Sequence, residues 1–251
     1  MGLTGRLRPV VDELLARGLE VRVTARDADA PHARELAARG ATIAPHRAGA
    51  AGERRHGINV AQAVAQTGDA LLVLFSGEGA DQATGVPVLD AKHAVERGIR
   101  ELGLTHTILA PVHLMQNAFN PWNVGALSAG RFALALPPDR ALQQLAIEDL
   151  ASVAATVAVR PAAFAGERIA LAGDELTGDE AAAALSRVTG RPFAFHEVAR
   201  DGLAPGMRLL FDWLERVGHR VDIPTLRRRL PEVRWQRFEQ WAAARDWPER
   251  P

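Results

Sequence analysis

Apolar side chains recur along the chain with two alternating periods. Residues 8–17 carry them on one helical face and end before Gly18, a residue type that favours a helix end. Residues 19–25 switch to a period of two, with Val21 and Val23 on one face of a predicted strand. Helix, glycine and strand then repeat, which is the pattern of a parallel sheet joined by crossover helices.

The alternation of helices and strands continues through the chain and becomes less regular in its second half. Residues 70–75 are wholly apolar, which suits a strand buried on both faces. After Pro111 the chain becomes less regular, and Thr177 with Glu180 three residues later forms a capping-box pattern. The predicted helices cover residues 8–17, 30–39, 53–66, 90–102, 147–159, 177–189, 207–217, 223–230 and 235–245, and the predicted strands cover 19–25, 41–44, 70–75, 105–109, 168–172 and 193–198.

The composition is that of an ordinary globular protein, with 47% apolar and 24% charged residues in a chain of 251. A formal net charge of zero gives no electrostatic support for a nucleic-acid partner. The absence of cysteine excludes disulfides, thiol catalysis and cysteine metal sites, and favours an intracellular, cytoplasmic protein. No apolar run reaches the length of a membrane span, and the first residues do not resemble a signal peptide. We expect a small-molecule substrate, and neither nucleic acid, membrane nor metal.

Two residue counts constrain the chemistry. The sequence has no tyrosine, so no phenol can act as a general acid. Lys92 is the single lysine among 30 basic residues. Because a compact ammonium and a planar guanidinium are not interchangeable, Lys92 is a candidate functional residue; the alternative is an ordinary exposed helix lysine.

Three parts of the chain, taken together and in order, resemble the NmrA-like branch of the atypical short-chain dehydrogenases. The first is GLTGRL, residues 2–7, running into the predicted helix 8–17. The second begins with GINVAQAVAQTG, residues 57–68, and continues through residues 72–117. The third, residues 167–195 followed by residues 208–242, is similar to the family's small substrate lobe and C-terminal helices.

The resemblance implies an α/β fold, with a Rossmann-like doubly wound parallel sheet and a small C-terminal α+β substrate lobe. Residues 1–112 are expected to form the NAD(P)-binding part. Residues 113–251 are expected to form the lobe and C-terminal helices, packed with the first part as one unit.

Two departures from the family pattern affect the predicted sheet. The hydrophobic strand expected before the glycine turn is missing, and Arg8 stands near the place of a third glycine. Residues 45–52 are too few for the internal strand, helix and strand that the family has there. We therefore expect the sheet to lack its central first and fourth strands. We also expect strand 19–25 to pair with strand 70–75, or with a replacement strand.

The family's cofactor contacts map onto two positions near the start of the chain. Arg26 ends a strand where an arginine suits the 2′-phosphate of NADP(H) better than the free hydroxyl of NAD(H), which remains the alternative cofactor. A solvated arginine in a turn is the competing interpretation of Arg26. The pyrophosphate-binding turn would be formed by Gly2, Thr4, Gly5, Arg6 and Leu7. Its alternative is a frayed terminus without a strand to anchor it.

Three further residues complete the expected site. Lys92 aligns with the lysine of the Tyr-x-x-x-Lys pair, which implies a catalytic residue that holds the nicotinamide ribose, but Val88 stands at the tyrosine position. Ser76 lies in the loop where dehydrogenases carry a serine that orients a carbonyl, although an ordinary polar loop residue is the commoner explanation. Pro111 closes the following strand and is expected to contact the cofactor.

The leading hypothesis is an NADP(H)-dependent oxidoreductase that transfers hydride between nicotinamide and a small quinone-like or carbonyl acceptor. Without a tyrosine, the acceptor's proton has to come from water or a histidine. One alternative is a non-catalytic NADP(H) sensor that binds a protein partner. Another is a truncated, internally deleted relative that binds nothing.

Overall fold

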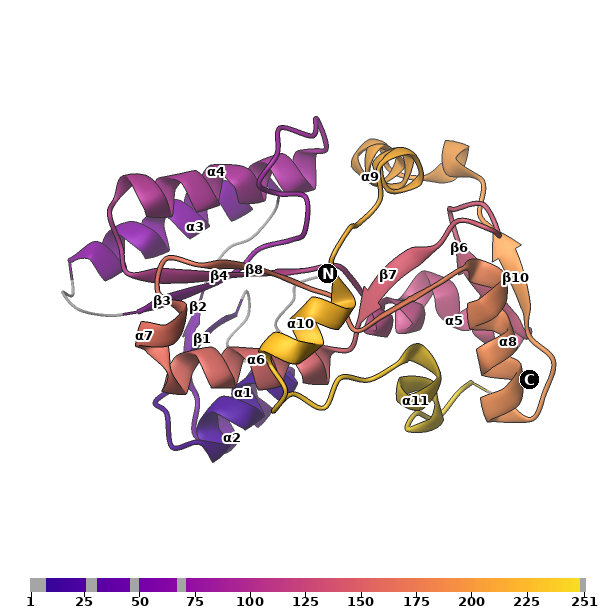
Figure 1. Ribbon diagram of the computed structural model, residues 1–251, viewed down its shortest axis with the longest axis horizontal. Coiled ribbons are helices and arrows are strands. Elements are labelled where there is room, and N and C mark those ends of the chain that lie inside the picture. The colour runs from indigo at the N-terminus through magenta and orange to yellow at the C-terminus, as the bar shows by residue number, and fades with distance from the viewer. Residues whose placement is uncertain (1–7, 26–30, 46–49, 67–70, 249–251) are drawn as a thin grey trace. The chain divides into compact units, whose positions relative to one another are not determined.

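The computed structural model (Figure 1) divides into two compact units. The first comprises residues 1–110 and 147–170, and the second comprises residues 111–146 and 171–251. The domains expected from the sequence, residues 1–112 and residues 113–251, stay a prediction. The structure describes residues 8–25, 31–45, 50–66 and 71–248.

The first unit is built of helices that alternate with short strands. The last residues of β4 and β8, Pro111 and Leu171, belong to the second unit. In chain order its elements are α1 (Arg8–Ala16), β1 (Arg22–Ala25), α2 (Pro31–Ala38), β2 (Thr42–Pro45), α3 (Ala50–Ala65), β3 (Leu72–Phe75), α4 (Pro87–Glu101), β4 (His106–Pro111), α6 (Ile147–Val159), α7 (Pro161–Phe164) and β8 (Arg168–Leu171).

The described strands of this unit form two sheets. β1 pairs in parallel with β2, and β3 pairs in parallel with β4, which has β8 on its other side. The expected pairing of strand 19–25 with strand 70–75 is therefore wrong for the described residues. Each of β1 and β3 pairs instead with the next strand along the chain, across one crossover helix. Helix α1 packs against α6 in the same unit.

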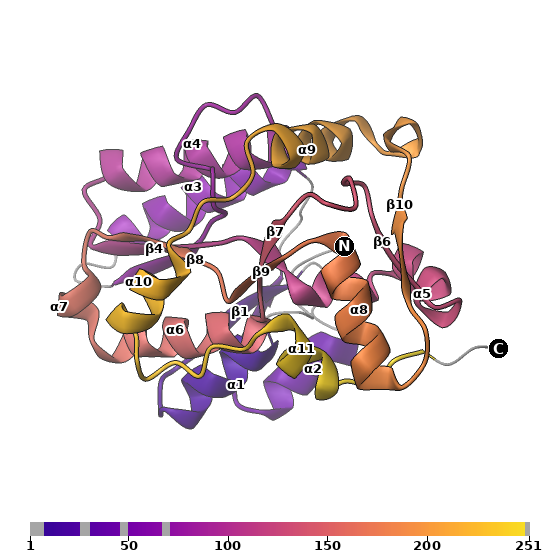
Figure 2. The ribbon, with the colours of Figure 1, turned by 45° about the vertical axis from the view of Figure 1, so that its right-hand side comes forward.

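Helices α3 and α4 cover one face of the β3–β4–β8 sheet, and α6 lies on the other face (Figures 1 and 2). Val95 and Ile99 of α4 are buried against Ala61 of α3. The two helices approach closely at Gly57, where an added Cβ would lie 2.6 Å from Val95 Cγ2. The glycine is therefore part of the packing of this helix pair.

The second unit carries the C-terminal half of the chain. Its core surrounds the fully buried rings of Phe238 and Trp241. β5, β7 and β9 form one sheet, with β7 in the middle, and β6 pairs in parallel with β10. Its elements are β5 (His113–Leu114), η2 (Met115–Phe119), α5 (Pro121–Ser128), β6 (Arg131–Leu134), β7 (Leu142–Leu145), β9 (Asp174–Leu176), α8 (Gly178–Thr189), β10 (Ala194–Glu197), η3 (Arg200–Gly202), α9 (Pro205–Arg216), α10 (Ile223–Arg229) and α11 (Phe238–Ala243).

The capping box predicted at the start of α8 is confirmed. The Glu180 amide donates to Thr177 Oγ1 at 3.2 Å, and the Thr177 amide donates to Glu180 Oε2 at 2.8 Å. The two side chains thus satisfy backbone donors that the first helical turn leaves without a partner.

None of the helices in the described ranges is long and apolar enough to cross a membrane.

Substituting Gly57 tests the close approach of α3 and α4. In Gly57→Ala the new methyl lies 2.6 Å and 2.8 Å from the two γ-carbons of Val95. We expect a loss of about 1–3 kcal/mol of stability from overpacking. Alanine favours a helix over glycine by roughly 1 kcal/mol, so the net loss of stability should be up to about 2 kcal/mol. Urea unfolding measures the difference.

Gly125 of α5 is the matched control, because no heavy atom other than its chain neighbours and its own helix backbone lies within 4 Å of the Cβ position there. Gly125→Ala should stabilise the protein through helix propensity alone. A Gly57→Ala protein as stable as Gly125→Ala would contradict the tight α3–α4 contact.

An ion pair between α8 and α11 predicts a pH dependence. Arg187 donates two hydrogen bonds of 2.9 Å to Glu239, and these hold the pKa of the Glu239 carboxyl below its usual range. A lowered folded-state pKa adds stability that is present above the unfolded-state pKa and is lost as the pH falls through the folded-state pKa. Glu239→Gln should therefore be less stable than wild type at neutral pH, and the gap should narrow on acidification. Thermal unfolding between about pH 7 and about pH 3 measures it; a gap that does not change with pH would contradict the assignment.

Candidate functional site

The candidate site lies where β3 ends and the chain turns toward α4. The parallel pairing with β4 extends one residue past the strand, because the Ser76 amide donates to the Leu109 carbonyl at 2.8 Å. The chain then turns tightly, and the Ala80 amide donates to the Gly77 carbonyl at 3.1 Å. We refer to residues 76–80 as the Gly77 turn.

Helix α4 starts three residues earlier than the sequence pattern predicts. Pro87 occupies its first turn, where the fixed φ of proline suits a helix and the missing N–H costs no intrahelical hydrogen bond. Asp90 accepts hydrogen bonds from the amide and the hydroxyl of Thr84, at 3.2 Å and 3.1 Å. These contacts join the end of the loop to the first turn of α4, the helix that carries Lys92.

Lys92 extends over the Gly77 turn. A Cβ placed on Gly77 would lie 3.4 Å from Lys92 Cδ and 3.8 Å from Lys92 Cε. The methylenes of the lysine therefore cover a residue that has no side chain. Val88 precedes Lys92 by four residues on the same helix, so the spacing of the short-chain dehydrogenase Tyr-x-x-x-Lys pair implied by the resemblance is present, with valine at the tyrosine position.

Ser76 is buried, with 5% of its surface exposed, and its hydroxyl donates a hydrogen bond of 2.5 Å to Glu96 Oε1. Glu96, one turn after Lys92 on α4, is fully buried. Two guanidinium groups compensate its charge. Arg168 Nε lies 3.1 Å from Glu96 Oε2, and Arg100 Nη2 lies 3.2 Å from the same oxygen.

Arg168 also binds the backbone of the turn. Its Nη2 donates to the Gly77 carbonyl at 2.8 Å and lies 3.3 Å from Asp81 Oδ1. One guanidinium from β8 thus joins a buried carboxylate on α4 to the turn after β3. The Glu96 network is the set of residues joined in this way: Ser76, Gly77, Asp81, Glu96, Arg100 and Arg168.

The structure brings two of the predicted site residues, Ser76 and Lys92, to the same turn. Pro111 ends β4. The remaining predictions, Gly2, Thr4, Gly5, Arg6, Leu7 and Arg26, lie outside the described residues.

Sequence reasoning missed Glu96 and Arg168. The signal for Glu96 was present, since it falls on the buried side of α4 between Val95 and Ile99. Arg168 carried no such signal, because only the pairing of β8 with β4 brings it near the turn.

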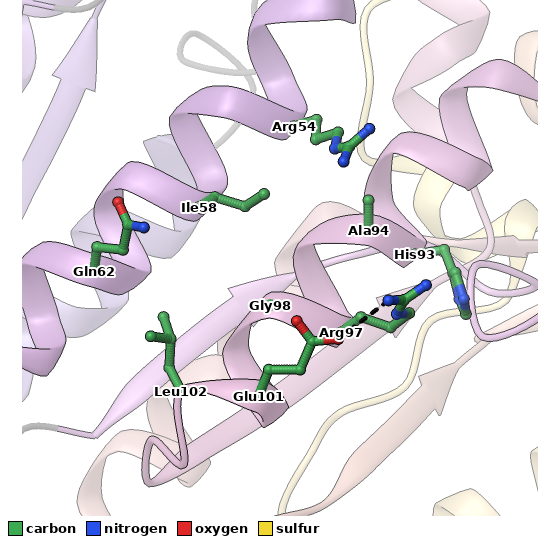
Figure 3. Close-up of a pocket in the computed structure, with 9 residues that line it drawn as sticks. All are labelled: Arg54, Ile58, Gln62, His93, Ala94, Arg97, Gly98, Glu101 and Leu102. Atoms are coloured by element: carbon green, nitrogen blue, oxygen red, sulfur yellow. Dashed lines mark hydrogen bonds and ion pairs between the residues drawn. The ribbon is translucent and has the colours of Figure 1, made fainter.

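A groove of about 370 Å³ lies between α3 and α4, and Figure 3 shows residues of both helices along it. Neither Ser76 nor Lys92 lines the groove. His93 connects it to the Gly77 turn, because His93 Nδ1 lies 2.8 Å from the Ala80 carbonyl oxygen. The lining residues are Arg54, Ile58, Gln62, His93, Ala94, Arg97, Gly98, Glu101 and Leu102.

In the part of the chain that is described, no group of three or more His, Cys, Asp or Glu side chains could hold a metal ion.

The fold is similar to several solved structures. An NADPH-dependent quinone oxidoreductase from Escherichia coli matches with a TM-score of 0.75 and 20% identity, over 96% of this chain and 97% of that one. NmrA, a negative transcriptional regulator solved with NADP, matches with a TM-score of 0.71 and 18% identity, over 96% of this chain and 92% of that one. The triphenylmethane reductase of Citrobacter sp., solved with NADP(H), matches with a TM-score of 0.71 and 15% identity, over 96% and 97%.

A sequence search of curated proteins finds no match. The structural likenesses show a shared Rossmann-like α/β fold. A family model adds a match in sequence, over residues 49–206, that includes the Gly77 turn, Lys92 and the Glu96 network. Because this match covers well over half of the chain, the protein belongs to the NmrA-like family.

Proposed function

We propose that the protein is an NADP(H)-binding oxidoreductase that transfers hydride between the nicotinamide and a small quinone-like or carbonyl acceptor. The observation that carries the proposal is the position of Lys92. It lies over Gly77 at the carboxyl end of β3, in a chain of the NmrA-like family. Ligands of open α/β sheets bind outside the carboxyl ends of the strands, which is where this lysine lies.

The residues around the turn fit a nicotinamide ribose. The ammonium of Lys92 offers three donors and no acceptor, which suits the hydroxyl oxygens of a sugar. Gly77 leaves the backbone beside it without a side chain. Structural neighbours solved with NADPH, NADP and NAD support the same cofactor class.

The preference for NADP(H) and the pyrophosphate contact come from sequence. Arg26 would bind the 2′-phosphate, and the glycine turn at residues 2–7 would bind the pyrophosphate. Pro111 would contact the cofactor from the end of β4.

When bound, the nicotinamide supplies or accepts the hydride. Lys92 orients the ribose by hydrogen bonding. Val88 has no proton to donate, so the proton for the acceptor oxygen comes from water or a histidine. Ser76 already donates its hydroxyl hydrogen to Glu96, and thus offers only lone pairs to any ligand that reaches it.

A second candidate function is a non-catalytic NADP(H) sensor that binds a protein partner. Val88 at the tyrosine position favours it, because a sensor needs the ribose contact of Lys92 but no acid. The regulator NmrA is among the structural neighbours. Both functions require the same cofactor contact and differ only in turnover.

Cofactor binding is tested by thermal unfolding with added NADPH. A ligand at 100 times its dissociation constant should raise stability by about 2.7 kcal/mol. Lys92→Met should weaken NADPH binding, whereas Arg97→Met, an exposed residue on the same helix, should leave it unchanged. No stabilisation of wild type at millimolar NADPH would reject both functions, and equal affinity of Lys92→Met and wild type would remove Lys92 from the site.

Turnover separates the two functions. We expect wild type to oxidise NADPH, followed by its absorbance, in the presence of a panel of small quinones. Lys92→Met should reduce kcat/KM together with cofactor affinity. Tight NADPH binding without oxidation on any quinone would support the sensor in place of the oxidoreductase.

A further inference from the structure

We infer that Glu96 and Arg168 are positioning residues that hold the Gly77 turn beneath Lys92 and thereby set cofactor affinity without touching the cofactor. This inference rests on the proposed function. It deepens that function by naming the residues on which the lysine's placement depends.

The first step is the burial of Glu96. A carboxylate that is fully buried must be paired, because leaving it without partners costs several kcal/mol. Its partners come from Ser76 at the end of β3, from Arg100 on α4 and from Arg168 on β8. Apolar residues of similar volume often give equal or greater stability than such a buried ion pair. Stability alone therefore gives no reason for this arrangement, whereas fixed geometry does.

The second step is the double use of Arg168. Its Nε contacts both oxygens of Glu96, at 3.1 Å and 3.3 Å, and its Nη2 donates to the Gly77 carbonyl at 2.8 Å. The planar guanidinium directs these donors at fixed angles, which a single ammonium cannot do. A lysine at this position would preserve the positive charge but not both contacts.

The third step links the turn to Lys92. Lys92 and Glu96 are four residues apart on α4, so their side chains leave the same side of the helix. Glu96 is joined through Arg168 to the carbonyl of Gly77, and the methylenes of Lys92 lie on Gly77 itself. A shift of the turn would remove the surface that supports the lysine and displace its ammonium.

The competing interpretation is a structural anchor only. In that case, changing Arg168 would lower the melting temperature but leave NADPH affinity unchanged at temperatures where the protein is folded. A double-mutant cycle with Lys92 distinguishes the two interpretations, because only a positioning role makes the effect of Arg168 depend on Lys92.

The experiment compares wild type, Arg168→Lys, Lys92→Met and the double variant by NADPH titration well below the melting temperatures. We expect Arg168→Lys to bind NADPH about tenfold more weakly, as the loss of one hydrogen bond from the displaced Lys92 ammonium to the ribose would give. The double variant should bind no more weakly than Lys92→Met alone. Arg97→Lys, on the exposed side of α4, is the matched control and should bind as wild type does.

Hydrogen exchange of the protein without cofactor gives a second readout. Arg168→Lys should speed amide exchange in residues 76–80 while leaving α1 and α6 protected. If Arg168→Lys does not fold, Glu96→Gln, which keeps the side-chain shape, replaces it in both measurements.

Four outcomes would be decisive. Affinity losses that add fully in the double variant, or unchanged affinity in Arg168→Lys, would overturn the positioning role. Unchanged amide exchange in residues 76–80 would overturn the claim that Arg168 holds the Gly77 turn in place. A wild-type protein that binds no NADPH would instead reject the proposed function, with the exchange result still reporting on the turn.

Discussion

The buried carboxylate of Glu96 is the constraint on which the candidate site depends. It has to be paired, and its partners lie on different elements: Ser76 follows β3, and Arg168 begins β8. Satisfying Glu96 therefore fixes α4 against the sheet. Through the second contact of Arg168 it also fixes the Gly77 carbonyl. Lys92 lies one helical turn from Glu96 and rests on the same glycine, so packing, charge pairing and the proposed chemistry meet at this turn.

The described strands around this site depart from a continuous doubly wound sheet. β1–β2 and β3–β4–β8 are separate, and helices α1 and α6 pack together within the same unit. The carboxyl end of β3 nevertheless keeps the turn and the lysine that the proposed function needs. An oxidoreductase that takes its proton from solvent and a sensor without turnover would share this geometry. They would differ in whether an acceptor is reduced. Val88 supplies no proton in either case, so the fold alone does not separate the two functions.

Periodicity predicted most helices and strands of the first unit, because their apolar positions recur with a helix or strand period; the short helix α7 was not predicted. It missed short strands of the second unit, among them β6 and β7. β7 was missed because Gln143 and Gln144 read as surface residues, although both are buried and the Gln143 amide pairs with both backbone groups of Val221. The buried side of α4 includes Glu96, but the sequence does not reveal its partner Arg168, which is distant along the chain. The family resemblance placed Lys92 correctly on a helix but could not reveal what holds the turn beneath it.

A crystal structure of the protein in complex with NADPH tests most directly whether Lys92, supported by the Gly77 turn, binds the nicotinamide ribose. We expect the hydroxyl oxygens of the nicotinamide ribose to lie within hydrogen-bond distance of Lys92 Nζ, about 2.7–3.2 Å. The contacts of Arg168 with Glu96 and the Gly77 carbonyl should be unchanged. NADPH bound away from the Gly77 turn, or Lys92 directed away from the bound ribose, would contradict the proposed role of this site.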